Sequence, residues 1–359
     1  MPRKASKSLT AAVSAELKSN FDLNNFKSKK GLGGNVKFKP QQWIPLSEAF
    51  QKVTSVPGIP MGHVCLLRGH SDTGKTTALI EAAVSAQKAK VLPVFIITEM
   101  KWNWEHAMQM GLDVQEIWDE ETGELLDYQG DFIYADRESL HTIEDVAAFI
   151  LDLLDEQKKG NLPYDLMFLW DSIGSVPCQM SVEKKKNNNE WNAGAMSTQF
   201  GNVVNQKVVM SRKESSPYTN TLVAINKVWT AKPETPMSMP KLMNKGGFTM
   251  WYDATFVATF GNISNAGTSK IKAIKDGKQV EFAKRTNLQI DKNHINGVTT
   301  RGRIIMTPHG FIEDSDKSLK NYKNDHAKEW AAILGGGNFD IIEEVDEATP
   351  EAVYTQEPD

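Results

Sequence analysis

The sequence contains few cysteines and no long apolar run. Only two of its 359 residues are cysteine, Cys65 and Cys178, which excludes a disulfide framework and a cysteine-rich zinc site. No stretch of about 18 apolar residues occurs, so we expect no membrane-spanning helix. The N-terminal segment is basic but has no apolar stretch behind it, which argues against a secretory signal. We therefore expect a cytoplasmic protein with no membrane partner, in which Cys65 is a buried core residue.

The net charge is close to neutral, but the two ends of the chain differ strongly. The composition, 40% hydrophobic and 24% charged, is typical of a globular protein with one large domain or two smaller ones. Residues 1–40 carry nine basic residues against two acidic ones, whereas residues 340–359 carry acidic residues and no basic one. This asymmetry suggests a nucleic-acid protein whose acidic tail competes for basic surface. Two solvated, disordered ends would give the same pattern.

The most informative motif lies at residues 69–77. It is a complete G-x-x-x-x-G-K-T phosphate loop, preceded by the apolar run 64–67 and followed by a segment of helical composition, as the motif requires. Lys75 would reach the β- and γ-phosphates of a nucleoside triphosphate, and the Thr76 hydroxyl would bind Mg²⁺. The candidate nucleotide-binding residues are Gly69, His70, Ser71, Asp72, Thr73, Gly74, Lys75, Thr76 and Thr77.

Alternating apolar runs and helical segments predict an α/β fold with a mostly parallel central sheet. Buried strands are expected at 64–68, 91–97, 131–134, 166–170 and 221–225, with helices at 76–88, 103–110, 142–159 and 192–213. Antiparallel strands that extend the sheet are expected near 254–260, 269–274, 279–282, 286–291 and 301–306, followed by a helix at 317–334. The expected division is a basic N-terminal arm (1–37), an ATPase core (38–312), a short helical segment (313–338) and an acidic disordered tail (339–359).

Two carboxylates end predicted strands. Asp171 follows the run 166–170 and would orient the water shell of Mg²⁺; a helix N-cap is the structural alternative. Glu99 follows the run 91–97 and would orient an attacking water. Because functional residues lie at the carboxyl ends of parallel strands, we expect both carboxylates on the same edge as Lys75.

A polar pair, Asn226 and Lys227, ends the next predicted strand, 221–225. It would lie on the same edge of the sheet, either as a sensor of the γ-phosphate or as a surface polar pair.

Five motifs in order along the chain resemble RecA-type recombinases. They are Pro60-Met61-Gly62-His63 before the phosphate loop, the glutamate after the second strand, Asp171-Ser172-Ile173, Ala224-Ile225-Asn226-Lys227, and Gly246-Gly247 before a new strand. The resemblance covers about residues 10–311, and the arm and spacing look closest to the UvsX-like phage branch. It implies a RecA-like P-loop ATPase core with two DNA-binding loops, which uses ATP and Mg²⁺ in DNA recombination and repair.

The resemblance also implies roles for individual residues at the nucleotide site. Glu99 would be the base that activates water. Lys227, where bacterial RecA carries glutamine, would be the sensor that couples the γ-phosphate to a DNA loop. Asn103 and His106 fall where the family contacts adenine; a surface helix residue is the alternative for His106.

Other implied roles depend on a neighbouring subunit. Lys292 and His294 fall where basic residues of the neighbour complete the catalytic site, so hydrolysis would be slow or pH-dependent if His294 is neutral. The segment from Leu9 to Phe26 would pack on the neighbouring subunit in a helical filament, or fold back on its own core.

Two loops have the composition of a single-stranded DNA-binding surface. The first, about 175–195, combines cations, amides and an aromatic side chain; its candidate contacts are Lys184, Lys185, Lys186 and Trp191. A solvated surface insertion is the alternative. The second loop, 228–245, is expected to be irregular, with apolar wedges for stretched DNA. Its candidate contacts, with the glycines that follow, are Trp229, Lys232, Met237, Met239, Lys245, Gly246 and Gly247.

The sequence therefore predicts a DNA-dependent ATPase that forms filaments on single-stranded DNA and exchanges strands with homologous duplex DNA. A single-strand binding protein and a loader are possible partners. Two alternatives remain open. One is a hexameric RecA-fold helicase motor, for which Arg301 and Arg303 are the candidate finger arginines. The other is an ATP-gated DNA-binding scaffold without strand exchange.

Overall fold

The computed structural model describes residues 21–30, 37–231, 241–244, 247–262 and 267–345. The chain divides into two compact units, one of residues 1–39 with 213–215 and one of the remaining residues. In the first unit, helix α2 (Leu23–Lys29) begins at Asp22, whose carboxylate accepts hydrogen bonds from the N–H groups of Asn24 and Asn25. A side-chain oxygen at this position satisfies N–H groups that the first helical turn leaves unpaired.

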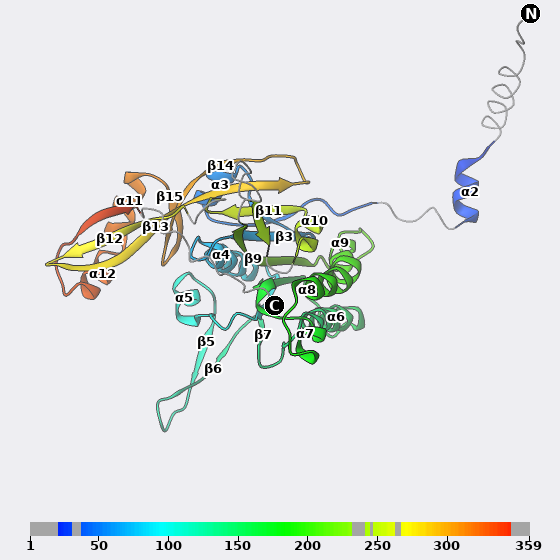
Figure 1. Ribbon diagram of the computed structural model, residues 1–359, viewed down its shortest axis with the longest axis horizontal. Coiled ribbons are helices and arrows are strands. Elements are labelled where there is room, and N and C mark those ends of the chain that lie inside the picture. Colours follow the sequence, from blue (N-terminus) through cyan, green and yellow to red (C-terminus); the bar gives the residue numbers. More distant parts are fainter. Residues whose placement is uncertain (1–20, 31–36, 232–240, 245–246, 263–266, 346–359) are drawn as a thin grey trace, which may run out of the picture. The chain divides into compact units, whose positions relative to one another are not determined.

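The second unit is built on one large sheet, which contains twelve strands within the described residues (Figure 1). Six of them are parallel, in the order β11 (Phe256–Phe260), β3 (Val64–Gly69), β9 (Thr221–Ala231), β8 (Leu166–Asp171), β4 (Leu92–Ile97) and β7 (Ile133–Asp136). Their near-continuous apolar sequences suit strands that are covered on both faces. All five strands expected before residue 250 are present, although the run at 131–134 forms its strand two residues later.

Antiparallel strands extend the sheet beyond β11. They are β13 (Lys278–Asn293), β14 (Arg301–Thr307) and β15 (Gly310–Glu313), with β12 (Ser269–Lys275) beside β13 and β16 (Asp340–Val345) beside β12. The two strands expected at 279–282 and 286–291 are one continuous strand, because no turn residue interrupts that segment. The acidic tail expected to be disordered from residue 339 instead begins with β16.

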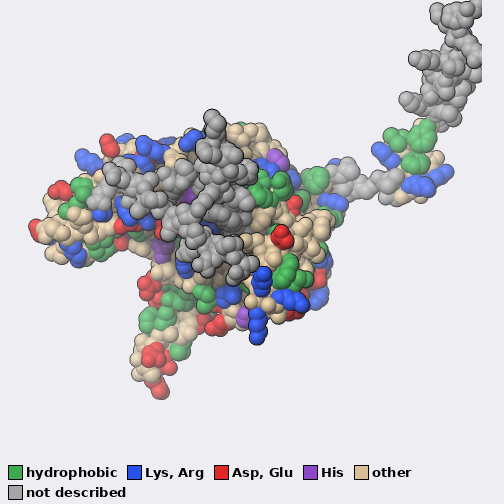
Figure 2. Space-filling model, viewed as in Figure 1, with side chains coloured by type: hydrophobic (Ala, Val, Ile, Leu, Met, Phe, Trp, Pro, Cys, Tyr) green, Lys and Arg blue, Asp and Glu red, His purple; other side chains and the backbone are tan. Residues whose placement is uncertain are grey.

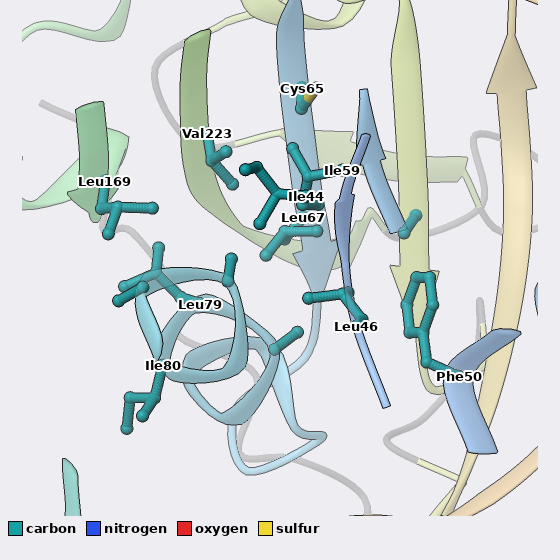
Figure 3. Close-up of a cluster of buried hydrophobic side chains, with 14 of the residues drawn as sticks. Ile44, Leu46, Phe50, Ile59, Cys65, Leu67, Leu79, Ile80, Leu169 and Val223 are labelled. Atoms are coloured by element: carbon teal, nitrogen blue, oxygen red, sulfur yellow. The ribbon is translucent and has the colours of Figure 1, made fainter. Parts of the chain in front are cut away.

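Helices cover the two faces of the sheet. On one face α4 (Lys75–Lys88) packs with α3 (Glu48–Thr54) and the small antiparallel pair of β1 (Trp43–Pro45) and β2 (Gly58–Pro60). Figure 3 shows part of this core, in which Leu79 of α4 lies near Leu67 of β3 and Val223 of β9. Burying one such side chain contributes about 1.5–3 kcal/mol, so this core holds the phosphate-loop helix firmly against the sheet.

The other face carries a longer helical layer. It consists of α6 (Ile143–Lys159), α8 (Asn189–Met196), a π-helical segment (Ser197–Val204), α9 (Asn205–Met210) and α10 (Thr249–Asp253). Helix α6 begins with a capping box, in which the Thr142 hydroxyl accepts from the Asp145 N–H and the Asp145 carboxylate accepts from the Thr142 N–H. It ends at Gly160, whose φ of 81° suits glycine.

The remaining elements surround this framework. Helix α5 (Trp104–Gln109) leads into a separate hairpin of β5 (Gln115–Trp118) and β6 (Leu125–Gln129), whereas β8 is followed by a 3₁₀ turn (Ile173–Ser175) and α7 (Gln179–Glu183). The single helix expected at 317–334 is two helices, α11 (Asp316–Asp325) and α12 (Ala327–Ile333), which meet at His326. No helix among the described residues is long and apolar enough to cross a membrane.

The region expected to be one irregular DNA loop, 228–245, is partly regular. Strand β9 continues to Ala231 and pairs with β10 (Lys241–Asn244), with Val228 opposite Asn244. The prediction of an irregular loop is therefore wrong at both ends of this segment.

Candidate functional site

The phosphate-loop sequence connects β3 directly to α4. Strand β3 ends at Gly69, and α4 begins at Lys75 with Gly74 as its N-cap residue at a φ of 104°. A Cβ at Gly69 would lie 2.1 Å from the Phe260 carbonyl oxygen, so this close approach to β11 requires glycine. The strand–turn–helix context that the motif requires is therefore present.

Lys75 is a buried cation in the first turn of α4. Only 5% of the residue is exposed, and its ammonium donates a hydrogen bond to the carbonyl of His70 within the same loop. Burial lowers the pKa of Lys75 to about 8, and Asp171 is the strongest of the charges that oppose this shift. An anion at the loop would supply the counter-charge that this buried ammonium needs.

Asp171 lies beside the phosphate loop, at the end of β8. The Thr76 hydroxyl donates a 3.0 Å hydrogen bond to its Oδ2 atom. The predicted alternative, a helix N-cap, is wrong, because Ser172 is the residue that precedes the following 3₁₀ turn. Burial and the nearby carboxylate of Glu99 raise the pKa of Asp171 to about 6, against hydrogen bonding from Thr76 and attraction from Lys75. A hydroxyl and a carboxylate oxygen side by side are ligands that suit Mg²⁺.

Glu99 and Lys227 form an ion pair on the same edge of the sheet. The Glu99 N–H donates to the Asp171 carbonyl at 3.1 Å, and Lys227 lies opposite Gly69 in the register of β9 and β3. The Lys227 ammonium bonds Oε1 of Glu99, and the two side chains are 29% and 18% exposed. The edge predicted from the sequence therefore brings together Lys75, Glu99, Asp171 and Lys227.

Asn226, next to Lys227, is a buried residue with 1% exposure. Its Oδ1 atom has no hydrogen-bond partner within the described part of the chain. The alternative of a surface polar pair is therefore wrong for Asn226. A ligand or a water molecule could donate a hydrogen bond to this buried oxygen.

The two residues expected to contact adenine are used differently. Asn103 caps α5, since its side-chain oxygen accepts a hydrogen bond from the N–H of His106. His106 is half-buried and faces a hollow of about 290 Å³, which Thr77 of α4 and Pro308 also line. Burial lowers the pKa of His106, against a hydrogen bond with the Pro308 backbone. The hollow is therefore adjacent to the phosphate-loop helix and contains a neutral aromatic ring.

Lys292 and His294 lie at the end of β13 and just after it. The Lys292 ammonium donates to the carbonyls of Trp251 and Tyr252 at 3.0 and 2.7 Å, and burial lowers its pKa. His294 is exposed, and its N–H donates to the Thr255 carbonyl. Their expected action across a subunit boundary stays a prediction.

The predicted DNA contacts in the first loop do not share one environment. Lys184, Lys185 and Lys186 are exposed at the end of α7, as phosphate contacts would need to be. Trp191 is half-buried in α8 and packs against the hydrophobic core of that face. Its ring therefore contributes to the core in this structure, which leaves less of it available for stacking on a base.

The second loop is described only in part. Gly247 has a φ of 86°, and the backbone of Trp229 belongs to β9. The side chain of Trp229 lies outside the described part of the chain, as do Lys232, Met237, Met239, Lys245 and Gly246.

Acidic side chains gather at the free end of the β5–β6 hairpin (Figure 2), a surface that would repel a phosphate backbone. This turn contains Asp119, Glu120, Glu121 and Glu124.

Sequence reasoning missed Glu81, which braces the phosphate-loop helix. Its two carboxylate oxygens accept hydrogen bonds from the backbone N–H groups of Ser47, at 3.1 Å, and Phe311, at 2.9 Å. The carboxylate thus connects α4 to the start of α3 and to β15. Its only sequence signal is one acidic residue in the otherwise uncharged stretch from Thr76 to Gln87, which no motif distinguishes.

Comparisons with known proteins point in the same direction as this geometry. No family model matches the chain. Protein RecA of Treponema denticola is 31% identical over 85 residues, which are 24% of this chain and 20% of that protein. RecA of Kineococcus radiotolerans is 32% identical over 117 residues, 32% of each chain, and RecA of Aquifex aeolicus is 28% identical over 102 residues, 27% of this chain and 30% of its own.

Each match is a partial similarity to a RecA protein. The chain matches only about a fifth to a third of the length of these curated relatives. The mixed α/β architecture with its large, mostly parallel sheet is compatible with a RecA-like core.

Proposed function

We propose that this chain is a DNA-dependent ATPase of the RecA type, which forms filaments on single-stranded DNA and pairs it with homologous duplex DNA. The observation that carries the proposal is the edge at which Lys75, Thr76, Asp171, Glu99 and Lys227 converge. Burial opposes charge on both Lys75 and Asp171, and shifted pKa values of this kind are common at functional sites.

The residues at this edge suit a nucleoside triphosphate with Mg²⁺. Lys75 and the loop N–H groups would bind the phosphates, and Thr76 with Asp171 would hold the ion or its water shell. When bound, Mg²⁺ supplies positive charge that offsets charge developing on the transferred phosphoryl group. The hollow beside His106 would receive the base, with Thr77 between it and the loop.

Glu99 is the proposed base that orients the attacking water. Its carboxylate is paired with Lys227 in the structure. We infer that Lys227 turns towards the γ-phosphate when nucleotide binds and frees Glu99 to accept a hydrogen bond from water. This exchange of partners would make Lys227 the sensor and link hydrolysis to β9, which continues into the second predicted DNA loop.

Strand exchange and the UvsX-like branch are proposed from the resemblance of the sequence motifs. We also propose a host cytoplasm as the location, and a single-strand binding protein or a loader as partners. Lys184, Lys185 and Lys186 are the described residues that we propose for phosphate contacts. Their effect on affinity should depend on salt, because each neutralised phosphate releases counterions.

The deciding experiment measures ATP turnover with and without single-stranded DNA, together with electron microscopy of the same samples. We expect DNA-stimulated turnover and helical filaments. Closed rings would favour a hexameric motor instead. Turnover that ignores DNA, without filaments, would leave an ATPase fold and remove the recombinase proposal.

A further inference from the structure

Two histidines and a glutamate converge away from the phosphate loop. His309 lies in the turn between β14 and β15, His326 at the junction of α11 and α12, and Glu329 in the first turn of α12. One ligand atom from each lies within 4.8 Å of the other two. The β14–β15 turn and the start of α12 thus bring two imidazoles and a carboxylate close together.

The two spacings to Glu329 fit a metal better than they fit hydrogen bonds. Nε2 of His309 is 3.3 Å, and Nδ1 of His326 is 3.4 Å, from the same oxygen, Oε2 of Glu329. Hydrogen bonds from nitrogen to oxygen are usually about 2.7–3.2 Å long. Ligand atoms of a tetrahedral zinc site, with bonds of about 2.0–2.2 Å, lie roughly 3.3–3.6 Å apart.

The surroundings hold His309 in the orientation that a ligand needs. Its Nδ1 atom is 2.8 Å from the hydroxyl of Tyr322, a buried residue of α11, which leaves Nε2 directed at Glu329. Metal-binding histidines usually donate their second nitrogen to such an oxygen. The amide of Gln109, at the end of α5, lies 3.1 Å from Nε2 of His309 and 2.9 Å from Oε1 of Glu329.

An ion could reach this point from solvent. The side chains of His309, His326 and Glu329 are 20%, 28% and 38% exposed. A hollow of about 370 Å³ opens beside both histidines and is also lined by Asp325 and Glu313. Acidic side chains along this approach favour entry of a cation.

We propose that His309, His326 and Glu329 bind a divalent transition metal, with Zn²⁺ the best fit. Two neutral imidazoles and one carboxylate are a zinc ligand set, whereas Mg²⁺ and Ca²⁺ prefer oxygen ligands throughout. The fourth position would be taken by water. The ion ties α12 to the β14–β15 turn, and the Gln109 contact extends the link to α5.

The test is titration of tag-free, nucleotide-free full-length protein with Co²⁺ and then Zn²⁺. We expect one equivalent of Co²⁺ with the visible spectrum of a four-coordinate site, displaced by Zn²⁺, and a higher thermal midpoint in the metal-bound protein. His326→Ala should lose both effects. Tyr322→Phe should weaken binding about 10- to 100-fold, as loss of an outer hydrogen bond to a ligand does.

Matched variants separate this site from other metal binding. His141→Ala removes an exposed histidine elsewhere and should bind like the parent chain. Asp171→Asn alters the phosphate-loop edge and should also leave Zn²⁺ binding unchanged. Absence of a stoichiometric Co²⁺ spectrum in the parent chain, or full binding by folded His326→Ala, would overturn the proposal and leave the cluster as a polar contact only.

Discussion

Replacing Asp171 by asparagine should make the nucleotide-free protein more stable while it removes Mg²⁺-dependent nucleotide binding. The carboxylate is 8% exposed, and burial raises its pKa from 3.8 to about 6. Asparagine keeps an acceptor for the Thr76 hydroxyl, which donates to Asp171 at 3.0 Å, but carries no charge to desolvate. A residue selected for ligand binding would thus reduce the stability of the empty fold.

The size of the effect follows from the two pKa values. Because the folded pKa is raised, the fold is more stable with Asp171 protonated than with Asp171 ionised. This stability is fully present below pH 3.8 and is lost as the pH rises through about 6. Each tenfold change in an ionisation constant is worth about 1.4 kcal/mol, so ionised Asp171 costs the nucleotide-free fold about 3 kcal/mol. Asp171→Asn should recover most of this amount at about pH 7.5 and less than about 1 kcal/mol at about pH 4.

Urea unfolding of the parent chain and the variant at both pH values measures this difference. Asp136→Asn, at the end of β7 on the far side of β4, is the matched control and should change stability by less than about 0.5 kcal/mol. Equal gains at both pH values would show that ionisation of Asp171 is not the cause. A variant less stable than the parent chain near neutral pH would refute the reasoning.

Other substitutions test the remaining parts of the site. Lys75→Ala should abolish ATP turnover, because the buried cation is the proposed phosphate contact; normal turnover would exclude the phosphate-loop assignment. Glu99→Gln should bind ATP and assemble but hydrolyse it at least about 100-fold more slowly, as expected for loss of a general base, and unchanged turnover would remove Glu99 from that role. Glu81→Leu should lower the free energy of unfolding by about 2–6 kcal/mol, because two backbone N–H groups lose their acceptor. Glu81→Gln keeps an acceptor and should lower it less. Equal effects of the two variants in urea unfolding would contradict this account. Removing residues 346–359 should strengthen duplex DNA binding at moderate salt if the tail occupies basic surface. Removing residues 340–359 should also destabilise the fold, because it deletes β16. No change in DNA affinity would leave the tail as a solvated end.

Strands that are buried on both faces were predictable from sequence, because their apolar runs reflect the environment directly. The runs that became β3, β4 and β8 were located within two residues. The sequence did not reveal the β1–β2 pair or the β5–β6 hairpin. Strands β1 and β2 have only three residues each, and β5 and β6 are mostly exposed, so neither pair has a clear apolar pattern. Strand β16 was missed because its acidic residues suggested disorder, whereas pairing with β12 and the contact of Glu343 with Arg285 hold it.

The predicted convergence of side chains is present where a residue's position follows from a strand end. Lys75, Glu99 and Asp171 converge because the carboxyl ends of neighbouring parallel strands meet at one edge. Asn103 shows the limit of such reasoning, because its side chain serves as a helix cap, a local use that spacing alone does not reveal. Trp191 shows another limit, since an aromatic residue in a cationic segment can still face the core.

The pair of Glu99 and Lys227 connects the two halves of the proposed mechanism. Glu99 follows β4, whereas Lys227 lies in β9, which continues through Val228 to Ala231 and pairs there with β10. A phosphate that attracts Lys227 would compete directly with Glu99, because one ammonium cannot neutralise both anions fully at this partly exposed edge. The same movement would displace the strand that leads into the second predicted DNA loop. One change of ion-pair partner would therefore prepare the base for water and alter the DNA-facing segment together, which is the coupling that a DNA-dependent ATPase requires.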